Sequence, residues 1–282
     1  MAEIYGPDID GIALGAEGLK VISPEFSKAK FTDLVESKGY RLAWSRAAVC
    51  PCQSADAQTR APDPNCPICR LIPGFLFFRP EGYNTEAVSA IGDLTEVQKY
   101  IIDREDSPSV VIRGVLMSIA RNTEAYSQIG DWVFGSFNLT TRPENRVGYY
   151  DRVVCLDAII PYSQIVHVTS SAGPLELRFP AVKVTLVRSV DKTFRPDIDF
   201  DLDGQGRLVF KPGKRPAKGT RFTVHYDHHP QFILIEHVNS FRDTVQKQRD
   251  PKKRSTPVGN TQTLPIRGVC RLEFLLGQGP ST

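Results

Sequence analysis

The sequence predicts a mainly β protein: a small β-barrel, a second β-sandwich-like or hairpin-rich region, an N-terminal helical or extended arm, and a cysteine-rich segment between arm and barrel. Short runs of β-branched and aromatic residues recur between turn residues along most of the chain. Glycines interrupt several of these runs, as they do where a strand bends. Helical spacing of apolar residues is confined to two short segments.

The composition narrows the class of protein. Apolar residues make up 41% of the 282 residues and charged residues 24%, as in a soluble globular chain. The formal charge of +3 is too small for a protein that binds nucleic acid over its whole surface, so any basic contact must be local. No apolar window approaches the roughly 18 residues of a membrane span, and the N-terminus lacks the pattern of a secretory signal. We therefore expect no membrane partner.

Five segments follow from these patterns. An arm with one helix precedes the cysteine segment, a β-barrel-like domain, a second β domain, and a basic loop with a C-terminal strand. Their predicted bounds are 1–49, 50–74, 75–165, 166–241 and 242–282.

Two helices are predicted. In the arm, Ser23-Pro24-Glu25 combines a capping hydroxyl, a proline for the first turn and an acid, and Gly39 supplies a stop. Apolar residues at helical spacing predict the second helix within Asp93–Asp103.

The predicted strands fall into two groups. Those of the barrel-like domain are Phe75–Phe78, Val110–Ile119, Asp131–Thr140 and Arg152–Ile160. Those that follow are Leu175–Phe179, Val182–Val190, a hairpin over Ile198–Phe210, Arg221–Tyr226, Gln231–Val238 and a final strand over Cys270–Leu276. In Val182–Val190, alternation predicts one face carrying Val182, Val184 and Leu186.

The strongest chemical signal is a group of four cysteines, Cys50, Cys52, Cys66 and Cys69. They form C-x-C and C-x-x-C pairs separated by thirteen residues. Zinc prefers four soft ligands in a tetrahedron, and two close pairs joined by a loop provide them. Pro51 and Pro67 stiffen the two turns. Because four thiolates leave no position open for water or substrate, we expect a structural zinc ion rather than a catalytic one.

Three other interpretations of the four cysteines are weighed against zinc: disulfide pairing within the loop, a thioredoxin-like redox site, and unliganded thiols. The redox site requires a strand-to-helix junction, whereas Cys66-Pro67-Ile68-Cys69 lies in a proline-broken loop. Zinc remains the preferred interpretation. The two other cysteines, Cys155 and Cys270, lie alone in apolar stretches and are expected in the core.

Three weaker constellations are expected to be structural. His225, His228, His229 and His237 favour a polar hairpin corner, with a metalloenzyme using His225, His228 and His237 as the alternative. The acids that alternate over Asp197–Asp203 favour a solvated strand face or an acidic contact surface. The basic loops 211–218 and 247–254 are either ordinary solvated loops or phosphate-facing surfaces. No G-x-S-x-G, P-loop or H-E-x-x-H motif is present, so we expect no enzymatic activity.

The cysteine segment also carries a family likeness. Cys50-Pro51-Cys52 followed by Pro62–Cys69 (P-D-P-N-C-P-I-C) resembles a cysteine-knuckle segment of virion structural proteins of tailed bacteriophages. The stretches Val111–Val115, Gly130–Gly135 and Tyr150–Leu156 resemble those of small β-barrel neck proteins, so the likeness covers roughly Cys50–Ile160. Arg70–Pro73 departs from that family's pattern, in which Gly-rich residues directly follow the knuckle.

The resemblance implies a subunit of the connection between head and tail (neck, collar or head completion), assembled in the host bacterial cytoplasm and located in the virion. Cys50, Cys52, Cys66 and Cys69 would be its zinc ligands. Its partners would be further copies of itself in a ring and other virion proteins, such as portal, connector, tail terminator or sheath. Such a subunit could also make non-specific contact with packaged DNA. Two alternatives stay open: a tail or baseplate protein, and a zinc-stapled nucleic-acid-binding module that uses Lys252, Lys253, Arg254 and the 211–218 loop.

Overall fold

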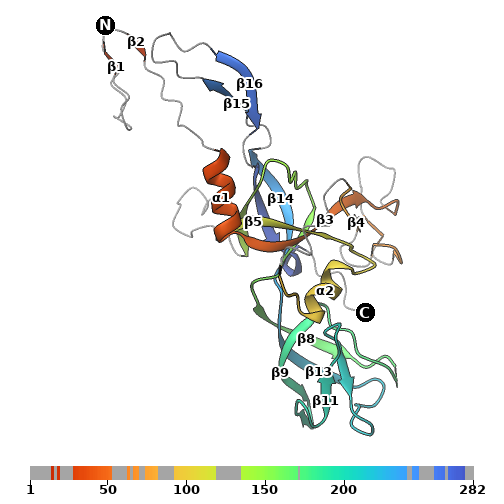
Figure 1. Ribbon diagram of the computed structural model, residues 1–282. Coiled ribbons are helices and arrows are strands. Elements are labelled where there is room, and N and C mark those ends of the chain that lie inside the picture. Colours follow the sequence, from red (N-terminus) through yellow and green to blue (C-terminus); the bar gives the residue numbers. More distant parts are fainter. Residues whose placement is uncertain are drawn as a thin grey trace.

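The computed structural model confirms a mainly β fold that contains a closed six-stranded barrel, a second group of strands and two short helices in the described part of the chain (Figure 1). The structure describes residues 14–15, 18–19, 28–52, 62–63, 66–69, 74–81, 92–118, 135–170, 172–239, 243–247, 257–263 and 266–276. Within these residues, no helix has the length and apolar character that crossing a bilayer requires.

The barrel is one antiparallel sheet that closes on itself. Its strands, in spatial order, are β3 (Tyr40–Val49), β5 (Val110–Ser118), β6 (Ser136–Thr141), β17 (Ile266–Leu272), β14 (Gln231–Asn239) and β7 (Arg152–Cys155). Closure comes from β3 pairing with β7, from Leu42 opposite Cys155 to Ser45 opposite Arg152. A further strand, β4 (Phe75–Phe78), pairs with the last four residues of β3, Arg46–Val49.

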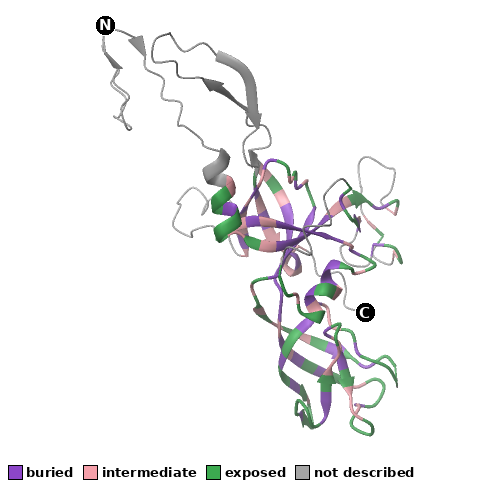
Figure 2. Cartoon of the chain, viewed as in Figure 1, coloured by how far each residue is buried: buried purple, intermediate pink, exposed green. Residues whose placement is uncertain are grey.

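Apolar side chains from alternate positions fill the barrel. Leu42 and Trp44 of β3 are fully buried beside Val153, Phe232 and Leu234. Figure 2 shows that buried residues are frequent along the barrel strands. At Gly114 in β5, a Cβ would lie 2.8 Å from the Leu42 Cδ1 atom, so a larger residue here would displace the buried Leu42 side chain.

The second β domain is inserted between two barrel strands. It contains a four-stranded sheet in the order β10-β9-β13-β8 and a β11–β12 hairpin. These strands are β8 (Ile160–His167), β9 (Ala181–Ser189), β10 (Thr193–Phe194), β11 (Phe200–Leu202), β12 (Leu208–Phe210) and β13 (Arg221–His228). Its core is separate from that of the barrel and is built around Phe179, Phe200, Phe222, Val224 and Tyr226.

The domain bounds predicted from the sequence therefore differ from the observed units. The barrel takes β3 from the predicted arm (1–49), β14 from the predicted second domain (166–241) and β17 from the predicted C-terminal segment (242–282). The insertion begins at β8, ahead of residue 166. Local patterns show where strands occur, but pairing between distant strands decides which sheet each one joins.

The strand predicted over Arg152–Ile160 is wrong, because two strands occupy this region. β7 ends at Cys155, and β8 begins at Ile160 in the other sheet. The intervening turn is held by Asp157, whose carboxylate accepts from the Arg41 backbone N (2.6 Å) and Nε (2.6 Å). The strand predicted over Leu175–Phe179 reduces to one bridge, between Leu175 and Leu208.

The face predicted for β9 is also wrong. Ala181, Val184 and Val187 are buried, whereas Val182 and Leu186 are exposed. Two irregularities in the pairing with β13 shift the register, one beside Tyr226 and one beside His228. A bulge adds one unpaired residue, so the buried positions recur every third residue instead of every second.

The two helices form close to their predicted positions. α1 (Lys28–Lys38) ends where the Gly39 N–H donates to the Val35 carbonyl (2.9 Å). A Cβ at Gly39 would lie 2.2 Å from that oxygen, so glycine is the residue that fits. The predicted start at Ser23–Glu25 lies outside the described residues. α2 (Glu96–Ile102) begins with a capping box between Thr95 and Gln98.

The remaining elements are short. They are β1 (Leu14–Gly15), β2 (Gly18–Leu19), β15 (Asp243–Lys247), β16 (Pro257–Thr263) and the 3₁₀ helix η3 (Glu273–Leu275). The predicted final strand over Cys270–Leu276 thus ends at Leu272, and η3 follows it.

A buried charge joins several parts of the barrel. Arg152 is 2% exposed. Its guanidinium donates to Glu273 Oε2 (3.0 Å), to Ser107 Oγ (2.9 Å) and to the side-chain oxygen of Gln231. These partners come from η3, β14 and the segment before β5, while Arg152 itself lies on β7. The buried guanidinium is thus met by acceptors on three sides, as its removal from water requires.

Replacing Glu273 by Ala is expected to lower the free energy of unfolding by about 3–5 kcal/mol, because the buried Arg152 charge loses its counter-ion. Chemical denaturation measures this change. The matched control is Glu96→Ala, which removes an exposed ion pair with Lys99 (2.9 Å) and should cost less than about 1 kcal/mol. Equally small effects of the two substitutions would contradict the assigned role of Glu273.

Candidate metal centre

The four predicted cysteine ligands lie at one end of the β3–β4 strand pair. Cys50 follows β3 directly, and Cys52 lies in the turn after it. Cys66 and Cys69 lie in a second turn before β4. Val49 pairs with Phe75, and the Cys50 N–H donates to the Gly74 carbonyl (2.8 Å). The strand pair therefore fixes both ends of the cysteine segment.

The structure brings all four sulfur atoms together. They lie within 4.8 Å of one another. The Cys50 Sγ is 3.8 Å from the Cys66 Sγ, and the Cys52 Sγ is 3.5 Å from the Cys69 Sγ. Each C-x-C residue thus lies beside one C-x-x-C residue. These separations exceed the bond of about 2.05 Å in a disulfide, and all four residues are free thiols. The four cysteines can therefore bind a metal ion.

The surrounding backbone changes the acidity of the thiols. The N–H groups of Cys69 and Ile68 point toward the Cys66 sulfur and lower the pKa of that thiol to about 7. Burial raises the pKa of Cys52 to about 12 and also raises that of Cys69. Cys66 is therefore the first of these three thiols to ionise. A bound cation favours the thiolate form of the others, since metal ligation deprotonates a coordinating thiol.

Gly74 is a contributor to this site that the motif did not reveal. Its N–H donates to the Cys69 sulfur (3.3 Å), while its carbonyl accepts from Cys50. Its φ is +89°, a conformation that side chains disfavour. The signal in the sequence was a glycine directly before the Phe75–Phe78 run. The conformation of the turn that leads out of the cysteine segment was not predicted, because Arg70–Pro73 departs from the family's pattern.

The two remaining cysteines lie in the apolar core, as predicted. Cys155 is 1% exposed and Cys270 is fully buried. Both belong to the apolar core. They are separate from the four-cysteine group, so they serve as controls for it.

The four histidines do not form one site. His225 lies on the outer face of β13, opposite Ser163 and Leu186. His237 lies on β14 with its ring against Tyr149. Among the residues that the structure describes, the cysteine group is the one cluster of three or more metal-ligand side chains.

The prediction of a polar hairpin corner at these histidines is wrong. β13 and β14 belong to different sheets, and His229-Pro230 carries the chain from the second domain into the barrel. His228 and His229 are buried in this crossing. The His228 ring stacks on the Phe179 ring with their centroids 4.3 Å apart. Its Nδ1 donates to the His229 carbonyl (2.8 Å).

Two acids of the acidic row pair with two lysines of the 211–218 loop. Asp199, predicted on a solvated face, is 5% exposed and lies beside Lys192 (3.3 Å) and Lys214 (3.9 Å). The Arg195 N–H and these lysines lower the pKa of Asp199. Lys211 pairs with Asp201 (3.6 Å). The second basic stretch, Lys252–Arg254, lies outside the described residues.

Metal analysis and cobalt absorption test the cysteine group. We expect the chain to bind about one divalent ion, and Cys66→Ser to weaken binding at least about tenfold because one of four ligands is lost. Cys155→Ala, a cysteine outside the group, should leave the metal content unchanged. Equal loss in both variants would contradict the assignment.

Acid is expected to destabilise the chain through His228. Burial lowers the pKa of His228 from its usual 6.5 to about 4, so the folded state holds the neutral ring. The unfolded state takes up this proton at a higher pH than the folded state. The free energy of unfolding is therefore unaffected above pH 6.5 and falls progressively between pH 6.5 and 4, by about 3 kcal/mol in total.

Unfolding free energies measured across this range test the assignment. His228→Gln should flatten the pH dependence, whereas His225→Gln, on the outer face of the same strand, should retain it. An unchanged slope in His228→Gln would contradict the role of this ring.

Comparison with models of known protein families finds no match to this chain. Comparison with curated proteins finds no match either.

Proposed function

We propose that this chain is a structural subunit of a tailed-bacteriophage virion, at or near the neck, and that its four cysteines hold one zinc ion. The observation that carries the proposal is the convergence of the Cys50, Cys52, Cys66 and Cys69 sulfurs at the end of the β3–β4 pair. The resemblance of this segment to virion knuckles supplies the biological setting.

Zinc is supported by the ligand set and its dimensions. Zinc–sulfur bonds of about 2.3 Å in a tetrahedron place sulfurs about 3.8 Å apart. Two of the sulfur pairs, Cys50–Cys66 and Cys52–Cys69, are separated by 3.8 and 3.5 Å. Four thiolates would complete the coordination of the ion, which favours a structural role over a catalytic one.

A role in assembly is supported by the surface beside the cysteines. Val49 is 63% exposed and Ile68 is 61% exposed, although both are apolar. Tyr150 stacks on Phe75 with ring centroids 4.4 Å apart and has a φ of +64°. A non-glycine residue held in this conformation is often part of a functional surface. A zinc ion would hold such a surface rigid, and a ring would repeat its contacts in every copy.

The partners that follow are further copies of the chain in a ring and neighbouring virion proteins, of the portal, connector, tail terminator or sheath type. The chain would be located in the virion after assembly in the host bacterial cytoplasm.

The proposal is tested in particles that carry this chain. Gold-labelled antibody should mark the junction between head and tail in electron micrographs, and the purified chain should contain one zinc ion. Label confined to another part of the particle, or less than about half a zinc ion per chain, would sink the proposal.

Assembly provides a second test. Cys66→Ser should prevent incorporation of the chain into particles, because the segment between β3 and β4 loses the ion that holds it. Cys155→Ala is the matched control and should be incorporated like the unsubstituted chain. Normal incorporation of the zinc-free Cys66→Ser chain would show that the metal has no part in assembly.

A further inference from the structure

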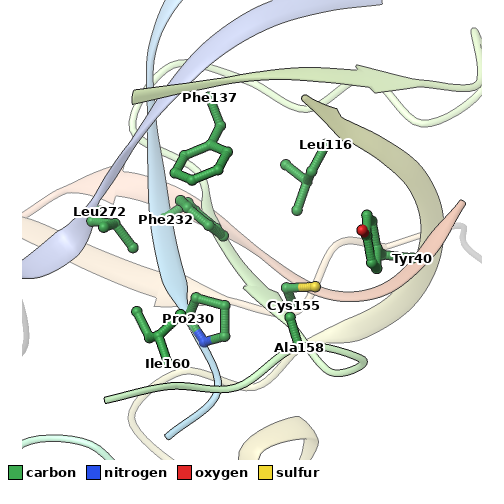
Figure 3. Close-up of a pocket in the computed structure, with 9 residues that line it drawn as sticks. All are labelled: Tyr40, Leu116, Phe137, Cys155, Ala158, Ile160, Pro230, Phe232 and Leu272. Atoms are coloured by element: carbon green, nitrogen blue, oxygen red, sulfur yellow. The ribbon is translucent and has the colours of Figure 1, made fainter. Parts of the chain in front are cut away.

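The barrel contains an apolar cavity at the end remote from the cysteine cluster. Its volume is about 170 Å³. Figure 3 shows the side chains that line it. Tyr40, the first residue of β3, lines this cavity, whereas the cysteines follow Val49 at the other end of the same strand. Ile160 and Pro230, where the chain leaves and re-enters the barrel region, also line it. The cavity is therefore a barrel-mouth site separate from the metal centre.

The walls of the cavity come from strands all around the barrel. Leu116 of β5, Phe137 of β6, Phe232 of β14 and Leu272 of β17 surround the space, and Cys155 of β7 lies beside them. Small barrels normally fill their interiors with side chains. Here Cys155 and Ala158 are small, and they leave space that the surrounding larger side chains do not occupy.

The side chains that line the cavity disfavour a charged ligand. The lining side chains end in carbon, apart from the Cys155 thiol and the Tyr40 hydroxyl. Burial raises the pKa of the thiol to about 11, so it is neutral. Tyr40 is 39% exposed, so it lies at the rim of the cavity. Nothing in the lining compensates the desolvation of an ion, so a charged ligand would be strongly disfavoured.

The size of the cavity sets the size of the ligand. Protein interiors are close-packed, and an unfilled apolar space loses the dispersion contacts of its walls. An engineered apolar cavity of about 150 Å³ is known to stay dry and to bind benzene. A space of 170 Å³ can take a molecule of similar or slightly larger size. Barrel mouths are also among the places where proteins bind small molecules.

We propose that the barrel mouth binds a small, uncharged hydrophobic molecule of about six to eight carbon atoms, held between Leu116, Phe137, Phe232 and Leu272 with Tyr40 at the rim. This site is independent of the metal and of the neck assignment. Its ligand can therefore bind whether or not the four cysteines hold an ion.

Methyl NMR of the full chain tests the site, with benzene as the probe and benzoate as a charged analogue of the same shape. Benzene should shift the methyl signals of Leu116, Leu272 and Ile160 in a saturable manner, and benzoate should not. Absence of saturable shifts with benzene would overturn the proposal. So would equal shifts with benzoate, because these would place the probe at a solvated surface.

Two substitutions that fill the cavity locate the binding. Ala158→Leu fills it from the turn after β7, and Leu116→Phe fills it from β5. Each should weaken benzene binding at least about tenfold. The matched control is Ile159→Leu, a neighbour that is 56% exposed and does not line the cavity. It should bind benzene like the unsubstituted chain.

Two outcomes of this series would count against the site. Undiminished binding by either folded filling variant would overturn the proposal, as would weakening by Ile159→Leu equal to that of Ala158→Leu. Circular dichroism identifies which filling variants fold. If one fails to fold, the other decides the result. If both fail, the side chains have no space to enter, and the cavity assignment is itself overturned.

Discussion

The architecture depends on the ten residues of β3. One part of this strand pairs with β5 on one side and with β7 on the other, and so closes the barrel. Its last four residues, Arg46–Val49, pair with β4, and Cys50 of the sulfur cluster follows them directly. Hydrogen bonding of one continuous strand therefore couples the packing of Leu42 and Trp44 to the position of the four cysteines. Disturbing its register by one residue would turn Trp44 out of the core and would also displace the cysteine turn.

The sequence was most informative where chemistry is local. The spacing of Cys50, Cys52, Cys66 and Cys69 favours nearby sulfurs whatever the rest of the chain does, and the structure brings them together. The mainly β class, the barrel and the helix at Glu96 also followed from local patterns. The preference for zinc and the setting in a virion rest on ligand chemistry and on a likeness, and they stay proposals.

The sequence was least informative where distant segments meet. β17 completes the barrel from the far end of the chain, and no pattern within Ile266–Leu272 specifies β6 and β14 as its neighbours. His228 was assigned to a polar hairpin corner because a His-His-Pro run is typical of a turn. Its burial follows from the Phe179 ring, which comes from a distant part of the chain, and from the change of sheet at Pro230. Bulges in β9 were equally invisible, since they arise from its pairing with β13.

The second domain enters and leaves the barrel through adjacent strands. β7 and β14 are paired, and the Cys155 N–H donates to the Pro230 carbonyl (3.0 Å) beside the crossing. The inserted chain leaves the barrel after β7 and returns at β14, the strand paired with β7, and inserted domains commonly have such closely spaced ends.

Such an arrangement is modular at the level of the gene. Recombination could exchange the coding region for residues 160–228 for another domain with closely spaced ends and keep every hydrogen-bonded strand pair of the barrel. The exchange would remove the packing partner of Phe274, whose ring lies 5.3 Å from that of Tyr162 in the inserted domain. Related chains could then share a barrel and differ in the domain it presents.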